Sequence, residues 1–317
     1  MTMAGPRVLA LSGGVGGARL ARGLADVLPA GALAVAVNVA DDFVHLGLAI
    51  SPDLDTVMYT LADVVNPETG WGRKDESWTF MTALERLGGE TWFRLGDADL
   101  AVHVERTRRL ALGEKLSSIT GTFCRSFGIA SEVLPVSDDR VATIVATPAG
   151  ALAFQDYFVR YRCEPVALGF TFAGAAEALV NPRILALLSD PALEAVVIGP
   201  SNPFVSIRPM LAMPEFGEAL TACRAPIVAV SPIVGGRAIK GPAAKMMRER
   251  GIDPSSLAVA AEYGSLLDGI VIDETDRAEA ASMTGVRVRV AETLMFGDRE
   301  RQRLAEAVLG LAAELAP

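Results

Sequence analysis

The sequence has little of the residue types that build metal clusters, disulfide frameworks and histidine-based active sites. Among its 317 residues are three cysteines and two histidines. Cys124, Cys163 and Cys223 are far apart and form no C-x-x-C pair, so neither a zinc knuckle nor a set of disulfides is expected, and a reducing compartment fits best. His45 and His103 stand alone, and a lone histidine is more often structural than catalytic.

Basic charge and long apolar segments are also scarce. Lysine and arginine number 29 against 38 aspartates and glutamates, which gives a net charge of −9. This balance argues against nucleic acid or an anionic membrane surface as the main partner. No apolar run reaches the roughly 18 residues that span a membrane, and the start of the chain does not resemble a signal peptide. We therefore expect a cytoplasmic protein without nucleic-acid or membrane partners.

Apolar residues, at 51%, and glycine, at 30 residues, are abundant. The first apolar segment, 8–11, indicates a strand buried on both faces, and a helical pattern begins at Ala18. Between them, Ser12 is followed by Gly13, Gly14, Gly16 and Gly17. A strand, a glycine turn and a helix N-terminus form a cradle for phosphate, to which Ser12 and Arg19 can also donate. The alternative is a tight turn that needs glycine for steric reasons alone.

Aspartates follow the second apolar segment, 33–39. Asp41 and Asp42 come directly after it, and Asp53 and Asp55 lie a short distance further on. The carboxyl ends of parallel strands are where open α/β sheets bind ligands, and hard oxygen ligands suit Mg²⁺. We therefore predict that these aspartates form a magnesium site beside the phosphate cradle. The alternative for Asp53 or Asp55 is to cap the helix that begins there.

Two later apolar segments end in loops of the same kind, at 195–198 and 227–230. The first leads to Ser201 and Asn202, which can donate to a phosphate or a ribose. The second leads to Arg237 and Lys240, which would make a compact anion site on an acidic protein. The alternatives are a plain strand-to-helix turn at the first loop and a solvated basic loop at the second.

Apolar segments alternate with helical patterns along most of the chain. This alternation predicts an α/β fold, a three-layer Rossmann-like arrangement with a largely parallel sheet and helices on both faces. We expect a single domain over 1–317 with a helix-rich insertion at about 62–127. The finer expectations are a helix over 99–127 with Leu100, Val104, Thr107 and Ala111 on one face, a hairpin turn at 137–140, strands into 154–158 and at 257–260, and a closing helix over 298–315.

Several segments together carry a family resemblance. They are Ser-Gly-Gly-Val-Gly-Gly-Ala-Arg from Ser12, Asn-Val-Ala-Asp-Asp from Asn38, Pro-Asp-Leu-Asp-Thr-Val-Met-Tyr-Thr-Leu from Pro52, Trp-Phe-Arg-Leu-Gly-Asp-Ala-Asp-Leu-Ala from Trp92, Phe-Gln-Asp-Tyr-Phe-Val from Phe154, Gly-Pro-Ser-Asn-Pro-Phe-Val-Ser-Ile from Gly199 and Ser-Pro-Ile-Val-Gly-Gly-Arg-Ala-Ile-Lys-Gly-Pro-Ala-Ala-Lys from Ser231. In this order the chain resembles the 2-phospho-L-lactate transferase family, which works in the biosynthesis of the deazaflavin coenzyme of methanogens and actinobacteria.

The resemblance implies a reaction and some site residues. The family transfers a phosphate-linked three-carbon acid, 2-phospho-L-lactate or phosphoenolpyruvate, from its guanosine diphosphate conjugate to the ribityl hydroxyl of 8-hydroxy-5-deazariboflavin. It releases GMP and requires Mg²⁺, and a homodimer is expected. Family knowledge places deazaflavin contacts at Asp55 and Arg94 of this sequence. From the residues alone, Arg94 can instead pair with Asp97 or Asp99.

Asp41, Asp42 and Asp53 are the candidate catalytic residues, and the glycine turn with Arg237 or Lys240 is expected to hold the diphosphate. A different class shares the glycine turn and the Gly-Pro-x-Ser segment: nucleotide-sugar-binding regulators of cell-envelope metabolism, which bind without catalysis. The segments from Pro52 and Trp92 favour the transferase, because they supply the acceptor site. A nucleotide-binding oxidoreductase is a weaker alternative, since no dinucleotide fingerprint is present.

Overall fold

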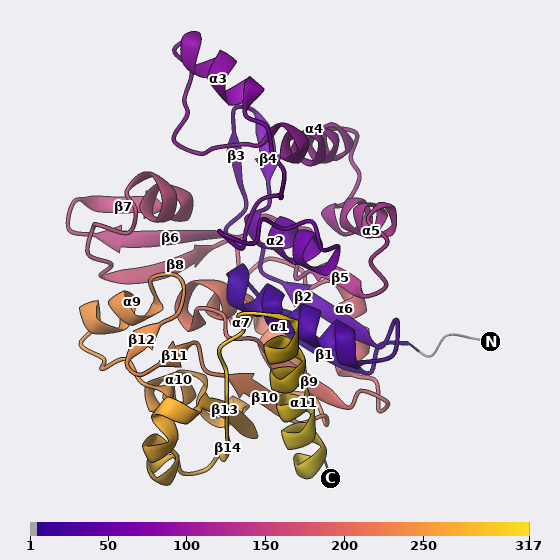
Figure 1. Cartoon of the computed structure of the whole chain (residues 1–317), viewed down its shortest axis with the longest axis vertical. Coiled ribbons are helices and arrows are strands. Elements are labelled where there is room, and N and C mark those ends of the chain that lie inside the picture. The colour runs from indigo at the N-terminus through magenta and orange to yellow at the C-terminus, as the bar shows by residue number, and fades with distance from the viewer. Residues whose placement is uncertain (1–4, 317) are drawn as a thin grey trace.

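The computed structural model describes residues 5–316, and its centre is a parallel sheet. The strands are β1 (Val8–Ser12), β2 (Leu33–Val37), β5 (Glu132–Pro135), β9 (Ala195–Ile198), β10 (Ile227–Val230), β13 (Gly269–Asp273) and β14 (Arg287–Ala291). They form one 7-stranded sheet in the order β14-β13-β10-β9-β1-β2-β5, and every neighbouring pair is parallel. This is the doubly wound order, so the predicted Rossmann-like fold is confirmed (Figure 1).

The central strands form because their apolar residues run without interruption. Every residue of β1, β2, β9, β10 and β13 is buried, as expected for strands covered on both faces. The edge strand β14 differs, since Arg287 is exposed and the rest of the strand is partly buried. Charged residues on an edge strand oppose pairing with another chain.

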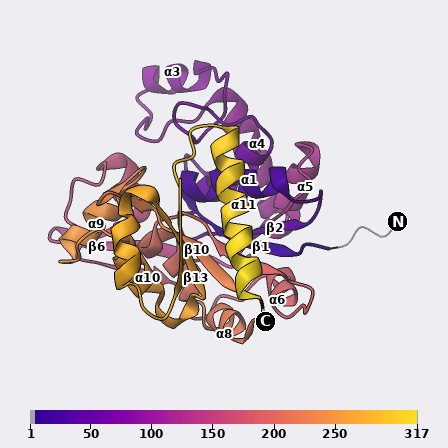
Figure 2. The ribbon, with the colours of Figure 1, turned by 60° about the horizontal axis from the view of Figure 1, so that its bottom comes forward.

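Helices cover both faces of the sheet. On one face α1 (Gly14–Val27) packs between α2 (Pro52–Leu61) and α11 (Asp298–Leu315), and Figure 2 shows α11 in front of the sheet. The closing helix is therefore confirmed. The crossover from β5 to β9 passes the first strand, so its right-handed connection places α6 (Pro182–Leu188) on the opposite face. There α6 packs against α8 (Pro214–Ala222).

Short elements complete the chain. They are α5 (Leu116–Ser126), the π-helical turns η1 (Asp156–Arg160) and η2 (Pro203–Ile207), α7 (Arg208–Leu211), the ribbon β11 (Ile233–Val234) and β12 (Arg237–Ala238), α9 (Ala243–Glu249), α10 (Ser256–Tyr263), and the 3₁₀ segments η3 (Gly264–Leu266) and η4 (Glu274–Ser282). A small antiparallel sheet has the order β7-β6-β8, from β6 (Ala142–Thr147), β7 (Gly150–Ala153) and β8 (Gly169–Ala173). Figure 1 shows it beside the main sheet. Along residues 5–316, no helix combines the length and apolar character needed to cross a membrane.

An insertion projects from the carboxyl end of β2, at the top of Figure 1. It contains the hairpin β3 (Phe43–His45) and β4 (Leu48–Ile50), then α3 (Thr79–Arg86) and α4 (Asp97–Ala111). Its own small core centres on Ile50, Met81 and Leu95.

Acidic side chains cap both helices of the insertion. Asp97, the first residue of α4, accepts hydrogen bonds from the amides of Thr79 and Phe80 at the start of α3. Glu76, in the loop before α3, accepts from the amides of Ala98 and Asp99 at the start of α4. Each carboxylate thus meets the positive end of a helix. The hydrogen bonds from Ser77 and Phe80 also lower the pKa of Asp97.

Several finer expectations are wrong. Residues 257–260 lie in α10, because Ser255 caps a helix there by accepting from the amide of Ala258. The expected helix over 99–127 is two helices, since Gly113 takes a positive φ of 84° between α4 and α5. The apolar face predicted for α4 is also misplaced: its buried residues are Val102, His103 and Arg106.

Two loop expectations fail as well. Residues 137–140 do not close a hairpin, because β5 belongs to the main sheet and β6 to the small one. Asp138 instead accepts from the amide and hydroxyl of Ser117 at the start of α5. The strand expected to run into 154–158 stops at Ala153, and a π-helical turn follows from Asp156.

The close contact between α1 and the loop after β9 can be tested at a glycine of α1. A Cβ on Gly16 would lie 2.3 Å from the carbonyl oxygen of Pro200, whereas one on Gly121 in α5 would meet nothing closer than 3.6 Å. We expect Gly16→Ala to lower the free energy of unfolding by about 1–3 kcal/mol. The control Gly121→Ala should raise it by about 0.5–1 kcal/mol, because alanine favours the helix. Denaturant unfolding measures both, and equal effects would contradict the packing argument.

Candidate functional site

The site lies at the topological switch point of the sheet, where the strand order reverses between β1 and β9. β1 and β9 are neighbours in the sheet, and the chain leaves them toward opposite faces. The amide of Gly13 donates to Oγ of Ser201 at 3.1 Å, and the amide of Gly199 donates to the carbonyl of Leu11 at 3.0 Å. The glycine turn and the loop after β9, both predicted as anion sites, are therefore in direct contact.

The glycine turn is shorter than expected, because α1 begins at Gly14 and contains Gly16 and Gly17 in its first turn. A Cβ on Gly17 would lie 2.5 Å from the hydroxyls of Ser12 and Ser201. Close packing thus explains part of the glycine content, as the steric alternative proposed. The amides of Val15 and Gly16 have no intrahelical partner and lie in a partly exposed stretch, so they can still receive an anion.

Asp53 links this turn to the aspartates. Its Oδ1 accepts from the amide of Gly14 at 2.6 Å, and its Oδ2 accepts from Nδ2 of Asn38 at 3.0 Å. Neither Asp53 nor Asp55 caps its own helix, which has no side-chain cap. Asp53 caps α1 instead. Asn38 was not singled out as a site residue, although it stands at the end of β2 in the segment that also contains Asp41.

Asp41 is buried and Asp42 is partly buried, and each has an oxygen that is shielded from water and unpartnered. Oδ1 of each has no hydrogen-bond partner among the described residues, and Oδ2 of Asp42 accepts from the hydroxyl of Ser51 at 2.7 Å. Burial, followed by the nearby charge of Asp53, raises the pKa of Asp41 well above its usual value. Burial likewise raises the pKa of Asp42, and it raises that of Asp53 to about 6. A bound cation would favour the ionised form of these carboxylates.

Asp55 has a different environment, because Arg106 from α4 neutralises it. Nη1 of Arg106 donates to Oδ2 of Asp55 at 3.1 Å, and Nη2 donates to Oδ1. Both side chains are buried. Sequence reasoning missed Arg106, which lies 51 residues further along the chain. The available signal was its position three residues after His103 on a helix, which places both side chains on one face.

Arg94 lies apart from Asp55. Its guanidinium stacks on the ring of Trp78, 4.1 Å from the ring centroid, in the exposed part of the insertion. No ion pair joins it to Asp97 or Asp99 in the described residues. The ion-pair alternative is therefore wrong. The structure brings Arg94 against Trp78 and leaves it without a contact to Asp55.

Cations gather near the first turn of α1. Lys240 donates from Nζ to the carbonyl of Thr69 at 2.6 Å, and a Cβ on Gly70 would lie 3.2 Å from Nζ and 2.6 Å from Val15. Burial and then the charge of Arg19 lower the pKa of Lys240. Burial and then Arg301 lower the pKa of Arg19. Arg301 is paired with Asp298, whereas Arg19 and Lys240 have no carboxylate partner among the described residues, so these two can attract an anion.

The other side chains that the sequence predicts as anion donors are not gathered at one place. Arg237 is exposed on the ribbon β11-β12, and Asn202 uses its side chain to accept from the amide of Phe204 at 3.0 Å. His45 is packed against Trp92, with ring centroids 5.0 Å apart, so it has a structural setting. Within residues 5–316, no three His, Cys, Asp or Glu side chains are arranged to hold a metal by themselves.

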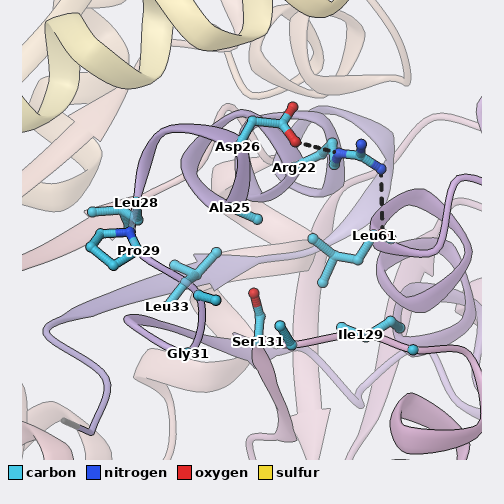
Figure 3. A pocket seen from close by; sticks show the side chains of 13 residues that line it. Arg22, Ala25, Asp26, Leu28, Pro29, Gly31, Leu33, Leu61, Ile129 and Ser131 are labelled. Carbon is cyan, nitrogen blue, oxygen red and sulfur yellow. Dashed lines mark hydrogen bonds and ion pairs between the residues drawn. The ribbon is translucent and has the colours of Figure 1, made fainter. Parts of the chain in front are cut away.

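A cavity of about 330 Å³ opens at the opposite edge of the sheet. It lies between the end of α1, the start of β2 and the chain after α5, and Leu33 lines it. Figure 3 shows Arg22 turned toward Asp26 and toward the carbonyl of Leu61, with hydrogen bonds of 2.8 and 3.3 Å. Arg22 is already paired with Asp26. This cavity therefore lacks the unpaired charges that gather at the carboxyl ends of the strands.

A doubly wound sheet with an anion-binding helix start, unpaired cations and buried aspartates at its switch point defines a nucleotide-binding type of α/β protein. The family model described as 2-phospho-L-lactate transferase CofD matches residues 8–306. The chain belongs to this family and is a transferase of this type.

Its relatives support this assignment. The chain is 39% identical to the phosphoenolpyruvate transferase of Streptomyces griseus over 98% of this chain and 99% of the relative. It is 38% identical to the 2-phospho-L-lactate transferase of Methanosarcina barkeri over 96% of this chain and 98% of the relative. A crystal structure of a UPF0052 family member from Bacillus halodurans shares the fold, with a TM-score of 0.61, 15% identity and coverage of 97% of this chain and 99% of that one. Because the curated relatives are named as transferases, the regulatory alternative is not favoured.

Burial raises the pKa of Asp53 from the usual 3.8 of an aspartate to about 6, which predicts a pH effect on stability. The folded state holds this proton more tightly than the unfolded state, so the contribution to stability is complete below pH 4 and is lost as pH rises through 6. In EDTA, raising the pH from about 4 to 7.5 should therefore cost the wild type on the order of 2–3 kcal/mol more than it costs Asp53→Asn. Denaturant unfolding at both pH values measures this, and parallel profiles would contradict it.

Proposed function

We propose that the protein transfers a phosphate-linked three-carbon acid from its guanosine diphosphate conjugate to the ribityl hydroxyl of 8-hydroxy-5-deazariboflavin and releases GMP. The observation that carries this proposal is the hydrogen bond of 2.6 Å between the amide of Gly14 and the carboxylate of Asp53. It joins the phosphate-binding end of α1 to the aspartates at the end of β2. The donor's phosphorus and the groups that act on the acceptor hydroxyl can therefore occupy one place.

The donor's diphosphate fits the start of α1. The amides of Val15 and Gly16 and the cations Arg19 and Lys240 gather there, and the loop at Gly70 lies against them. Amides at a helix N-terminus favour negative charge, and phosphoryl transfer needs positioning and charge neutralisation more than covalent help. We assign these groups to the diphosphate. The ribbon that ends near Lys240 also carries Arg237, which is exposed and can meet the nucleotide.

The aspartates fit a magnesium ion. Asp41 has a carboxylate oxygen without a partner, and the charge of Asp53 lies close enough to raise its pKa. Mg²⁺ is bound by one or two carboxylates together with substrate phosphates, so the absence of a three-ligand cluster among residues 5–316 is compatible with this ion. We assign Asp41 and Asp53 to it. When bound, it would neutralise charge on the diphosphate. Asp55 is not assigned to it, because the charge of Arg106 already neutralises its carboxylate.

Asp42 is assigned to the proton of the acceptor hydroxyl. It is less buried than Asp41, its Oδ1 has no partner in the described structure, and burial raises its pKa, which makes its carboxylate a stronger base. In a direct transfer the hydroxyl oxygen forms a bond to the phosphorus as the bond to the GMP oxygen breaks. The hydroxyl proton passes to Asp42, and GMP leaves with the bonding electron pair.

The acceptor is expected on the insertion side. Family resemblance assigns Asp55 and Arg94 to the deazaflavin, and in support the charge of Asp55 contributes to the raised pKa of Asp42, so the two carboxylates interact. An ionised carboxylate has lone pairs left after a two-pronged contact with arginine, so Asp55 can still accept a hydrogen bond. The stacked pair of Arg94 and Trp78 offers a flat surface for the ring. We also expect a homodimer from the family resemblance.

A competition assay tests the reaction. Purified protein with the deazaflavin acceptor is offered the guanosine conjugates of phospholactate, phosphoenolpyruvate and phosphoglycerate together, and mass spectrometry follows the products. We expect one transferred product to dominate, with one GMP formed for each deazaflavin consumed. Because transfer is direct, donor alone should leave no covalent adduct on the protein. GMP release without acceptor, or no product from any donor, would contradict the proposal.

Removal of magnesium tests the assigned ligands. Activity should be lost in EDTA and return with Mg²⁺, since the buried carboxylates need a cation to ionise. At pH 7.5, Mg²⁺ should also raise the unfolding temperature of the wild type but not that of Asp41→Asn. The matched control is Asp138→Asn, because Asp138 only caps α5 and should leave the magnesium effect intact. Full turnover in EDTA would contradict the magnesium assignment.

A further inference from the structure

A buried polar network joins α2 to α4. Asp55 and Tyr59 lie one turn apart on α2, and α4 contributes Asp99, His103 and Arg106. Arg106 and His103 are each only 1% exposed, and Asp55 is 5% exposed. The start of α2, where the aspartates gather, is therefore connected to the insertion through charged groups that have been removed from water.

Arg106 is the centre of this network. Its two terminal nitrogens donate to the two oxygens of Asp55, the geometry in which arginine binds a carboxylate most specifically. Nη1 also donates to the carbonyl of Ala49 in β4 at 3.3 Å. One side chain thus connects α4, the start of α2 and the hairpin of the insertion.

Tyr59, Asp99 and His103 complete the network. The hydroxyl of Tyr59 donates to Oδ1 of Asp99 at 2.5 Å. The ring of His103 lies between the two acids, with Nδ1 3.7 Å from Oδ2 of Asp55 and Nε2 3.3 Å from Oδ2 of Asp99. Nδ1 is also 3.3 Å from Nη1 of Arg106. Among the described residues, the side-chain hydrogen bonds to the carboxylate of Asp55 therefore come from Arg106.

Stability alone does not account for such a pair. The cost of taking two charges out of water can exceed their mutual attraction, and apolar residues often replace buried ion pairs without loss. What a two-pronged arginine contact supplies is a fixed carboxylate orientation. The charge of Arg106 also lowers the pKa of Asp42, against the larger effect of burial, so it acts on the same aspartates that carry the chemistry.

We propose that Arg106 is a positioning residue for the acceptor site: its two-pronged contact holds the carboxylate of Asp55 in one orientation, so that the deazaflavin meets a preformed acceptor of hydrogen bonds. This inference rests on the proposed function, in which Asp55 contacts the deazaflavin. Arg106 acts through Asp55 and does not touch the substrate itself.

The test compares arginine-to-lysine changes at two positions of α4. Arg106→Lys keeps the charge and removes the two-pronged contact. The matched control is Arg109→Lys, one turn along the helix, where the arginine pairs with Glu114 instead. Deazaflavin fluorescence measures acceptor binding, and GDP is the probe for the donor side. We expect Arg106→Lys to weaken acceptor binding about tenfold and to leave GDP binding within twofold, whereas Arg109→Lys changes neither.

A double-variant cycle separates positioning from general destabilisation. In an Asp55→Asn background, Arg106→Lys should have little further effect on acceptor binding, because the carboxylate that it orients is gone. The proposal would be overturned if the losses of acceptor-binding free energy in the two single variants added in full in the double variant. It would also be overturned if Arg106→Lys folded and bound the acceptor with wild-type affinity. Failure of the wild type to bind deazaflavin would instead refute the proposed function.

If Arg106→Lys does not fold, a double variant that removes both charges of the ion pair replaces it in the test. Asp55→Asn with Arg106→Gln leaves no buried charge unpaired, so it avoids the main cause of misfolding at this position. Positioning through Asp55 predicts that this pair and Asp55→Asn alone bind the acceptor equally. Weaker binding by the pair would show that Arg106 acts by another route and would overturn the proposal.

Discussion

The carboxylate of Asp53 is the contact on which the arrangement of the site depends. It accepts from Gly14 at the start of α1 and from Asn38 at the end of β2, while its own backbone begins α2. Three elements from the first part of the chain are thereby fixed at the switch point of the sheet. The carboxylate of Asp53 is buried by this arrangement, and burial raises its pKa to about 6. A nearby cation would stabilise the ionised form, which supports our proposal of a magnesium ion here.

The aspartates differ in whether a basic side chain neutralises them. Arg106 neutralises Asp55, whereas no arginine or lysine in the described residues forms a hydrogen bond or ion pair with the side chain of Asp41 or Asp53. The sequence predicted that the aspartates would need a compensating cation. The structure supplies that cation for Asp55 from α4, and Asp41 and Asp53 are the two that we propose for a magnesium ion. A group that looks uniform in the sequence thus has two electrostatic environments.

The insertion and the sheet make separate contributions. The insertion has its own small core and two helices capped by acidic side chains within it, so its shape does not depend on the main core alone. The sheet holds the glycine turn, the loop after β9 and the cations near α1. The buried network of α2 and α4 joins the two parts. Our proposal places the donor on the sheet and the acceptor on the insertion.

Local pattern alone determined the central sheet, because unbroken apolar segments such as 33–37 admit few structures other than a buried strand. It also located the glycine turn and the aspartates, since both follow strand ends. Pattern failed where partners are distant in sequence. An apolar segment at 257–260 became a helix through the cap at Ser255, and charged residues of α4 were buried because Asp55 receives Arg106 across 51 positions. The burial of a charge depends on what faces it in space, and only the tertiary structure decides that.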